Sequence, residues 1–364
     1  MSQTPTQHVM TPRQRWLALL DGQHADRVPT DIWRTPEVDA RLKRELNCLD
    51  DEALCRRLHI DMPHHVAPPF GPAVRCRLPH HPDDPEANIW GVRMQQVAYG
   101  TGEYSEAVHH PLASVETVAQ VEAFRWPTAD DFDYTSMAGE LAKIDGTRIV
   151  MGGAYEPFLL ACEMRGMEQA FRDLLRKPAI IEAILAHIFD FYHEHNRRIF
   201  EAAQGRIDIF YLAEDLGGQH GPLLSLQLYR RFLKPNQIRM ADLARKHGAR
   251  IFYHTDGAAR PFLGDLIDDV GINILNPIQY KCPGMERDAL VRDFGDRVVF
   301  HGAIDNQQVM PFGSVEDVRE EVRRNLDFFA RSRWICAPCH MIQPNTPTAN
   351  IVALYDEIHR LGQA

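Results

Sequence analysis

Two segments far apart in the sequence carry side chains that bind metals or transfer protons. His254 and Asp256 follow the apolar residues 249–253, and His340 follows the apolar residues 334–337. Each apolar run is typical of a buried strand. In an α/β barrel the C-terminal ends of the parallel strands open at one face, where side chains from different strands can meet. The pattern therefore predicts that these three residues lie in one active site.

His254, Asp256 and His340 make a set of two imidazoles and one carboxylate. Such a set suits zinc with an open coordination position, or another divalent ion. Because the set holds no thiolate, a bound ion would favour oxygen-containing substrates over thiols. The same residues also fit a metal-free site in which they bond the substrate or each other, so the sequence leaves both interpretations open.

Other predicted strands also end in residues suited to proton transfer. Glu214 and Asp215 are adjacent after residues 207–213, and neighbouring residues on a strand point to opposite sides. One carboxylate can therefore face the pocket as a base, although Asp215 suits capping of the following turn equally well. His301 ends residues 298–301. It is either a third catalytic candidate or a core histidine with satisfied ring nitrogens.

Several further residues near predicted strand ends are candidates for contacting a substrate. They are Trp33, Arg34, Glu156, Arg260, Asn276 and Gln279. Arg34 and Arg260 carry the planar guanidinium that grips a carboxylate, and surface salt bridges are the alternative for both. We expect one cavity to be lined by Trp33, Glu156, Glu214, His254, Asn276, His301 and His340.

Strand and helix patterns alternate along most of the chain. The predicted strands cover residues 27–33, 59–66, 148–151, 207–213, 250–253, 272–275, 298–301 and 334–337. The clearest predicted helices cover residues 11–20, 115–124, 168–175, 178–201 and 315–330. The first helix has Thr11 as its N-cap and Pro12 in its first turn. Repeated strand–helix units indicate a parallel sheet, and eight of them indicate a closed (β/α)8 TIM barrel.

Residues 88–108 interrupt this alternation. Apolar and polar residues alternate over 92–98, a Gly100-Thr-Gly102 turn follows, and residues 104–108 alternate again. This pattern predicts an antiparallel hairpin that leaves the barrel. No low-complexity segment or linker divides the chain, so residues 1–364 are predicted to form a single domain.

The composition excludes several classes of partner. The chain has 364 residues, 45% of them hydrophobic, and a formal net charge of −10 without any Lys/Arg-rich block. These values argue against binding to nucleic acid or to an anionic membrane. No apolar run reaches the roughly 20 residues of a membrane helix, and the polar N-terminus lacks a signal-peptide core. We therefore expect a cytoplasmic protein whose seven scattered cysteines are reduced. Its oligomeric state stays open.

Phrases spread over nearly the whole chain resemble the uroporphyrinogen decarboxylase superfamily. They are Asp26-Arg-Val-Pro29, Trp90-Gly91, His110-Pro-Leu-Ala113, Glu214-Asp-Leu-Gly-Gly-Gln219, His254-Thr-Asp-Gly257, Ile274-Leu-Asn-Pro-Ile-Gln279, Phe300-His-Gly-Ala-Ile-Asp305 and Thr346-Pro-Thr-Ala-Asn350. The resemblance implies a TIM barrel and one of two activities. One branch decarboxylates porphyrinogens without a cofactor, and the other transfers methyl groups to or from corrinoid proteins, often with zinc.

The chain departs from both branches. True decarboxylases of the superfamily carry Arg-Gln-Ala-Gly-Arg after the first strand, where this chain has Trp33-Arg-Thr-Pro-Glu37. Zinc methyltransferases carry His-x-Cys-Gly after the fifth strand and a cysteine after the eighth. The corresponding places here hold His254-Thr-Asp256-Gly257 and His340. The missing arginines argue against porphyrinogen decarboxylation, and the missing thiolates make zinc an expectation to be tested.

The resemblance favours methyl transfer between a small methylated compound and a corrinoid protein. Zinc or another divalent ion on His254, Asp256 and His340 would polarise the heteroatom that bears the methyl group. Glu214 or Asp215 would take or supply the accompanying proton. One rival is a metal-free decarboxylase in which Arg34 and Arg260 bind carboxylates. The other is a barrel without catalysis that serves as a binding or corrinoid-docking subunit.

Overall fold

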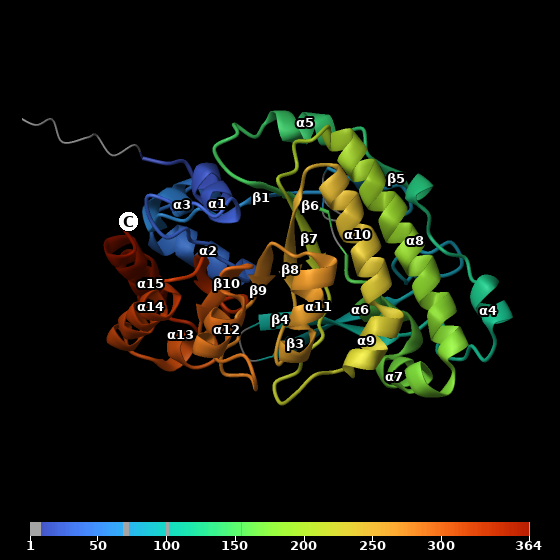
Figure 1. The fold of residues 1–364 in the computed structure, drawn as a ribbon. Coiled ribbons are helices and arrows are strands. Elements are labelled where there is room, and N and C mark those ends of the chain that lie inside the picture. The colour runs from blue at the N-terminus through green and yellow to red at the C-terminus, as the bar shows by residue number, and fades with distance from the viewer. Residues whose placement is uncertain (1–8, 68–72, 100–101, 154, 364) are drawn as a thin grey trace, which may run out of the picture. The chain divides into compact units, whose positions relative to one another are not determined.

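The computed structural model of the chain describes residues 9–67, 73–99, 102–153 and 155–363 (Figure 1). Its main sheet consists of β1 (His64–Val66), β6 (Val150–Gly152), β7 (Ile209–Ala213), β8 (Arg250–His254), β9 (Ile274–Asn276), β10 (Val299–Ile304) and β11 (Trp334–Pro338), in that order across the sheet. The pairs β6–β7, β7–β8, β9–β10 and β10–β11 are parallel. Every residue of β10 and β11 is buried, which explains why these strands are apolar runs rather than alternating ones.

The sheet has seven strands in the described part of the chain, where eight were predicted. The missing one is the expected first strand over residues 27–33. Only isolated parallel bridges join Thr30 to Cys336 and Arg34 to Ile342. Pro29 has no N–H to donate, so a continuous ladder cannot run through this segment. The prediction of a regular strand there was therefore wrong, although the segment does lie beside β11.

Helices connect the strands. They are α1 (Pro12–Leu20), α2 (Pro36–Glu45), α3 (Asp51–Leu58), α4 (Val118–Glu122), α5 (Met137–Ala142), α6 (Pro157–Arg165), α7 (Met167–Arg176), α8 (Pro178–Ala203), α9 (Leu226–Phe232), α10 (Lys234–Lys246), α11 (Leu263–Asp265), α12 (Arg287–Phe294), α13 (Val309–Phe312), α14 (Val315–Phe329) and α15 (Thr348–Leu361), with the short helical turns η1 (Ala129–Asp131), η2 (Arg260–Phe262) and η3 (Leu266–Val270). The predicted start of α1 is confirmed, because the Thr11 side chain accepts the Gln14 N–H in a capping box.

Two small antiparallel sheets stand apart from the main sheet. Strands β3 (Arg93–Tyr99) and β4 (Gly102–His109) pair with each other, and residues 100–101 of the expected turn lie outside the described residues. Strands β2 (Arg75–Cys76) and β5 (Phe132–Asp133) pair as well. A strand of two residues has no sequence period, so β2 and β5 could not be predicted.

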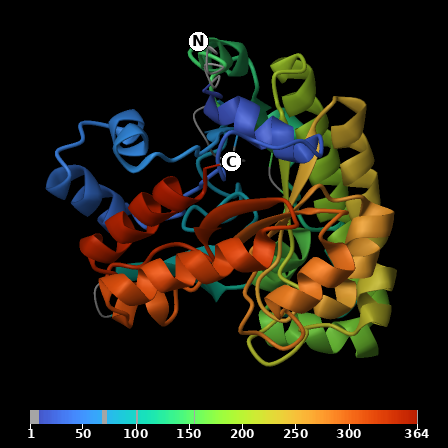
Figure 2. The same cartoon turned by 60° about the vertical axis from the view of Figure 1, so that its left-hand side comes forward.

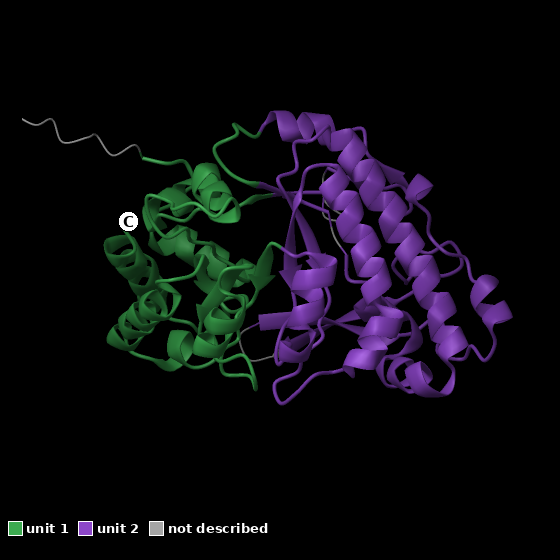
Figure 3. Cartoon of the chain, viewed as in Figure 1, with its two compact units in different colours: residues 1–64, 144–149, 273–364 green, residues 65–143, 150–272 purple. Residues whose placement is uncertain are grey.

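The chain divides into two compact units, shown in Figure 3. Unit 1 comprises residues 1–64, 144–149 and 273–364, and unit 2 comprises residues 65–143 and 150–272. In unit 1, α14 and α15 lie side by side (Figure 2). In unit 2 the long helix α8 packs against α6 and α10. The prediction of a single domain stays a prediction. No helix among the described residues combines the length and apolar character needed to cross a membrane.

Candidate active site

The loops that follow β7 and β8 in unit 2 bring one imidazole between two carboxylates. Ala213 and His254 are paired at the ends of the two parallel strands. The His254 Nε2 atom lies 3.9 Å from Asp215 Oδ1 and 3.8 Å from Asp256 Oδ1. The Asp256 backbone N–H donates to Asp215 Oδ1 at 3.1 Å, which holds the Asp215 carboxylate against the loop after β8. This arrangement concentrates negative charge around a buried imidazole.

Backbone contacts between these two loops explain why both contain glycine. A Cβ atom on Gly217 would lie 2.6 Å from the Asp256 carbonyl oxygen, and one on Gly257 would lie 2.6 Å from the Gly218 carbonyl oxygen. Gly257 also has a positive φ of 71°, which an L side chain rarely adopts. The Ala258 N–H donates to the Gly218 carbonyl at 2.9 Å. The close approach of the loops therefore sets the distance between Asp215 and His254.

Glu156 and Tyr211 extend the same cluster. Burial raises the pKa of Glu156; His254 opposes this rise, and the Asp215 and Asp256 carboxylates add to it. The Tyr211 ring stacks on His254 with a centroid distance of 6.1 Å. Burial and these carboxylates raise the pKa of the Tyr211 hydroxyl well above its usual value. Tyr211 was not identified from the sequence, because an aromatic residue inside an apolar strand gives no signal beyond that of the core.

Glu214 and Asp215 have different surroundings. The Glu214 side chain is 1% exposed, and its carboxylate accepts the N–H groups of Phe158 at 3.0 Å and Leu159 at 3.2 Å, at the start of α6. Burial raises the pKa of Glu214 well above its usual value. Glu214 therefore caps a helix, and Asp215 is the member of the pair that faces His254. The sequence had suggested Asp215 as the capping alternative.

A second cluster lies in unit 1, around the fully buried His301. Its Nε2 atom lies 3.0 Å from Asp31 Oδ2, and its Nδ1 atom lies 2.7 Å from the Asn276 amide nitrogen. The Trp33 indole N–H donates to the same Asp31 oxygen at 3.1 Å. The Trp33 ring meets the His340 ring edge-on at a centroid distance of 6.3 Å. The structure thus brings four of the predicted site residues together around Asp31, which the sequence analysis did not select.

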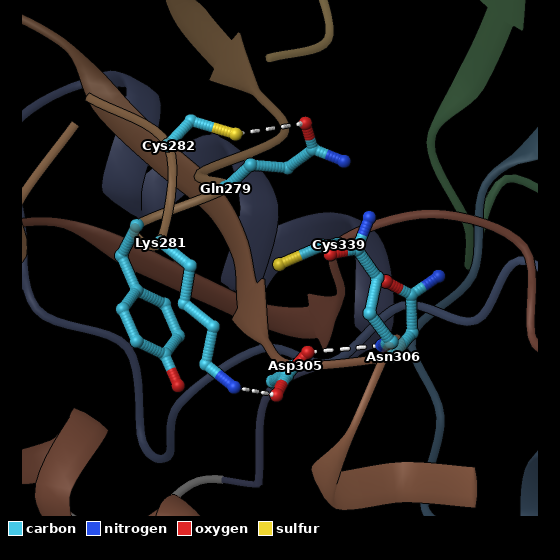
Figure 4. A pocket seen from close by; sticks show the side chains of 8 residues that line it. Gln279, Lys281, Cys282, Asp305, Asn306 and Cys339 are labelled. Carbon is cyan, nitrogen blue, oxygen red and sulfur yellow. Dashed lines mark hydrogen bonds and ion pairs between the residues drawn. The ribbon is translucent and has the colours of Figure 1, made fainter. Parts of the chain in front are cut away.

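A small pocket in unit 1 is drawn in Figure 4. Its lining includes Gln279, Cys339 and an ion pair between Lys281 and Asp305. Burial alone would raise the pKa of Asp305. The Lys281 ammonium and the N–H groups of Gln307 and Val309 outweigh burial and hold that pKa below its usual value. The predicted substrate contact Gln279 therefore lies in a pocket beside a charged pair.

The two arginines proposed to grip a carboxylate differ in what surrounds them. The Arg34 side chain is 8% exposed and forms ion pairs with Asp39 at 2.6 Å and Asp51 at 2.5 Å. These partners already neutralise its guanidinium, as the salt-bridge alternative supposed. Arg260 opens the short turn η2, six residues after His254 in unit 2.

The donor atoms fit a divalent ion by their chemistry. Ligand atoms at roughly 2.0–2.2 Å from a tetrahedral zinc lie about 3.4 Å apart, and the His254 nitrogen lies 3.8 and 3.9 Å from its two carboxylate oxygens. His254 and Asp256 of unit 2 are therefore two candidate metal ligands, and the third ligand predicted from the sequence, His340, belongs to unit 1. Imidazole and carboxylate are both ordinary ligands of zinc.

Comparison with known proteins identifies the class of the chain. A family model described as uroporphyrinogen decarboxylase matches residues 92–361. The match covers most of the chain, and the protein therefore belongs to the uroporphyrinogen decarboxylase family. No curated protein sequence matches the chain.

Solved structures support the fold. A methyltransferase from Methanosarcina mazei is 18% identical with a TM-score of 0.68, and the alignment covers 96% of this chain and 99% of that one. A B12-independent methionine synthase from a Shewanella species is 10% identical with a TM-score of 0.39, over 92% of this chain and 96% of that one. The first similarity shows a shared fold, and the second is too low to carry an argument.

Proposed function

We propose that the protein transfers a methyl group between a small methylated compound and a corrinoid carried by a partner protein. The observation that carries the proposal is the His254 imidazole held between Asp215 and Asp256 at the ends of β7 and β8. Its fold is shared with a methyltransferase. Members of one family can catalyse different reactions, so the site decides the reaction rather than the family name.

In this proposal His254, Asp256 and His340, the ligands predicted from the sequence, hold one divalent ion, most simply zinc. A bound ion supplies Lewis-acid polarisation of the heteroatom that bears the methyl group. Asp215 faces the same His254 nitrogen as Asp256 and takes or supplies the accompanying proton. Glu156, whose pKa is raised by burial, remains protonated to a higher pH than an ordinary carboxyl group and can donate a hydrogen bond to the substrate.

Metal analysis of the purified protein tests whether it binds a divalent ion. We expect about one divalent ion per chain, and we expect His254→Ala to lose both the ion and the activity while keeping the fold. A suitable control is His187→Ala, because His187 is a more exposed histidine of the same unit that pairs with Glu122 at 3.0 Å. Full metal occupancy in a His254→Ala/His340→Ala double variant would disprove the ligand assignment.

A demethylation assay tests the reaction. The protein is incubated anaerobically with a reduced corrinoid protein and a panel of small methylated compounds, and the methylated corrinoid is followed by its absorbance. Loss of the ion removes several kcal/mol of transition-state stabilisation, so His254→Ala should lower the rate by about a hundredfold or more. Equal rates for the His254→Ala variant and the wild-type protein would contradict the proposal.

Decarboxylation of a porphyrinogen is the second candidate, because the chain belongs to the family named for that reaction. A porphyrinogen presents several carboxylates and needs clustered, unoccupied arginines. Arg34 is instead paired with Asp39 and Asp51. We therefore expect little or no turnover of uroporphyrinogen in anaerobic incubation, with products separated by their number of carboxylates. Stepwise loss of four carboxylates at an enzymatic rate would favour this candidate over methyl transfer.

A further inference from the structure

The Asp31 carboxylate is a buried junction of three N–H groups in unit 1. The residue is 1% exposed. Its Oδ1 atom accepts the Ile32 N–H at 2.8 Å, and its Oδ2 atom accepts the Trp33 indole N–H at 3.1 Å and faces His301 Nε2 at 3.0 Å. A buried carboxylate is stabilised when such donors replace the water it has lost. Removing its charge therefore affects three groups at once.

The backbone around Asp31 is held in place independently of that carboxylate. The Asp31 N–H donates to the Cys336 carbonyl of β11 at 3.0 Å, and the Tyr355 hydroxyl donates to the Asp31 carbonyl at 2.9 Å. These bonds remain when only the side chain is changed. A change of the carboxylate to an amide should therefore alter the orientation of its partners while leaving the segment beside β11.

His301 is occupied at both ring nitrogens. The Asn276 amide nitrogen can only donate, so His301 Nδ1 accepts at 2.7 Å and Nε2 carries the proton that points at Asp31. With no free ring nitrogen, His301 orients Asp31 rather than exchanging a proton with a substrate. This interpretation agrees with its complete burial. The orientation of Asp31 is in turn transmitted to the ring of Trp33.

Trp33 connects this junction to His340. Its indole N–H is fixed by Asp31, and its ring meets the His340 ring at an interplanar angle of 73° and the His301 ring at 46°. A large ring with a fixed hydrogen bond restricts the rotamers of the side chain packed against it. The available orientations of the His340 imidazole therefore depend on where Asp31 holds the indole.

We propose that Asp31 is a positioning residue that, through the Trp33 indole, orients His340 as a metal ligand. The proposal rests on the proposed function, in which His340 binds the ion. Groups that orient metal ligands without touching the metal typically change metal affinity by about 10- to 100-fold when they are mutated. Asp31→Asn should therefore weaken metal binding by about tenfold or more, although Asp31 is not itself a ligand.

Cobalt(II) is the probe for this test, because its visible absorption reports the geometry of its ligands. The affinity of the metal-free protein for cobalt(II) is measured by titration for the wild-type protein, Asp31→Asn and a matched control, Glu357→Gln. Glu357 is also a buried carboxylate of unit 1, and its ion pairs are with Arg323 and Arg360. Near-ultraviolet circular dichroism checks that each variant is folded.

The emission of Trp33 gives a readout that a general loss of stability would not change. Cobalt(II) on His340 should quench Trp33, and the quenching at saturation should be weaker in Asp31→Asn, where the indole is no longer fixed. Trp33→Phe should abolish this component of the quenching. The same variant keeps an aromatic ring without the N–H, so it also weakens cobalt(II) binding and serves as the test should Asp31→Asn not fold.

The outcomes separate this inference from the proposed function. Weaker binding and weaker quenching in Asp31→Asn, with Glu357→Gln within about twofold of wild type, support the positioning role. Wild-type cobalt(II) affinity in both Asp31→Asn and Trp33→Phe, with wild-type quenching in Asp31→Asn, overturns the positioning role and leaves the metal site intact. Failure of the wild-type protein to bind cobalt(II) overturns the metal-assisted function and this inference with it.

Discussion

Glu214 and Asp215 illustrate how two adjacent carboxylates serve different ends. Because neighbouring strand residues point to opposite sides, the Glu214 side chain reaches the first N–H groups of α6 and Asp215 reaches His254. The first contact stabilises the fold, and the second belongs to the candidate active site. The two residues should therefore separate stability from activity when they are substituted one at a time.

We predict that Glu214→Ala lowers the free energy of unfolding by about 2–3 kcal/mol, because it leaves the buried Phe158 N–H and the partly buried Leu159 N–H without their acceptor. Asp215→Asn, at a half-exposed side chain, should change stability by less than about 0.5 kcal/mol and reduce activity. Denaturant unfolding measures both free energies. A larger stability loss in Asp215→Asn than in Glu214→Ala would contradict this division of roles.

His195 on α8 predicts a loss of stability in acid. Burial lowers the pKa of His195 to about 4, and its Nδ1 atom lies 2.8 Å from the Tyr134 hydroxyl. The unfolded chain takes up this proton near pH 6.5, well before the folded protein does. The contribution of neutral His195 to the free energy of unfolding is therefore complete above about pH 6.5. It is lost as the pH falls toward 4, by about 3 kcal/mol in total.

The substitution His195→Gln isolates this contribution. Glutamine offers Tyr134 both a donor and an acceptor but cannot be protonated, so the variant should be less stable at pH 7 and lose less stability between pH 6.5 and 4. The measurement is the free energy of unfolding in urea at several pH values. Parallel pH dependence of the variant and the wild-type protein would show that another group is responsible.

At the scale of elements, the loops after β7 and β8 position the candidate site through backbone contact. We predict that Gly257→Ala lowers the free energy of unfolding by at least about 2 kcal/mol and weakens metal binding, because its φ is positive and the new Cβ meets the Gly218 carbonyl. Gly264→Ala is the control, since a Cβ there has no atom within 4 Å. Equal stability of the two variants would contradict the prediction that a Cβ atom at Gly257 meets the Gly218 carbonyl.

Much of the fold follows from local sequence patterns. The apolar runs at β7, β8, β10 and β11 and the capping signal of α1 were predicted close to their observed bounds, because a buried strand or a cap is specified by adjacent residues. The irregular conformation of the segment with Pro29 was not predicted. The place of this segment beside β11 depends on contacts with residues about 300 positions away.

The candidate site was predictable in part, and for a similar reason. Residues that directly follow a strand, such as His254 and Asp256, could be selected from the sequence. Asp31 could not, because its partners His301 and Trp33 are joined only in the folded chain. One signal was present nevertheless: a carboxylate between apolar neighbours in Val-Pro-Thr-Asp31-Ile-Trp indicates a buried and therefore partnered charge.

For the whole molecule, a bound ion should act as a source of stability. A ligand that binds the native state alone stabilises it by about 2.7 kcal/mol at a free concentration of 100 times Kd. We predict that zinc raises the melting temperature of the metal-free protein by a few degrees and that chelation reverses the shift. The effect should be absent in His254→Ala and present in His187→Ala, as measured by calorimetry. A shift that persists in His254→Ala would place the ion elsewhere.

The distribution of thiols has a practical consequence for studies of motion. Cys55, Cys162, Cys282, Cys336 and Cys339 are buried, whereas Cys48 and Cys76 are partly accessible. Cys48 belongs to unit 1 and Cys76 to unit 2. Mild maleimide labelling should therefore attach one fluorophore or spin label to each unit of the native chain. The distance between the two labels could then be measured by spectroscopy without introducing a cysteine.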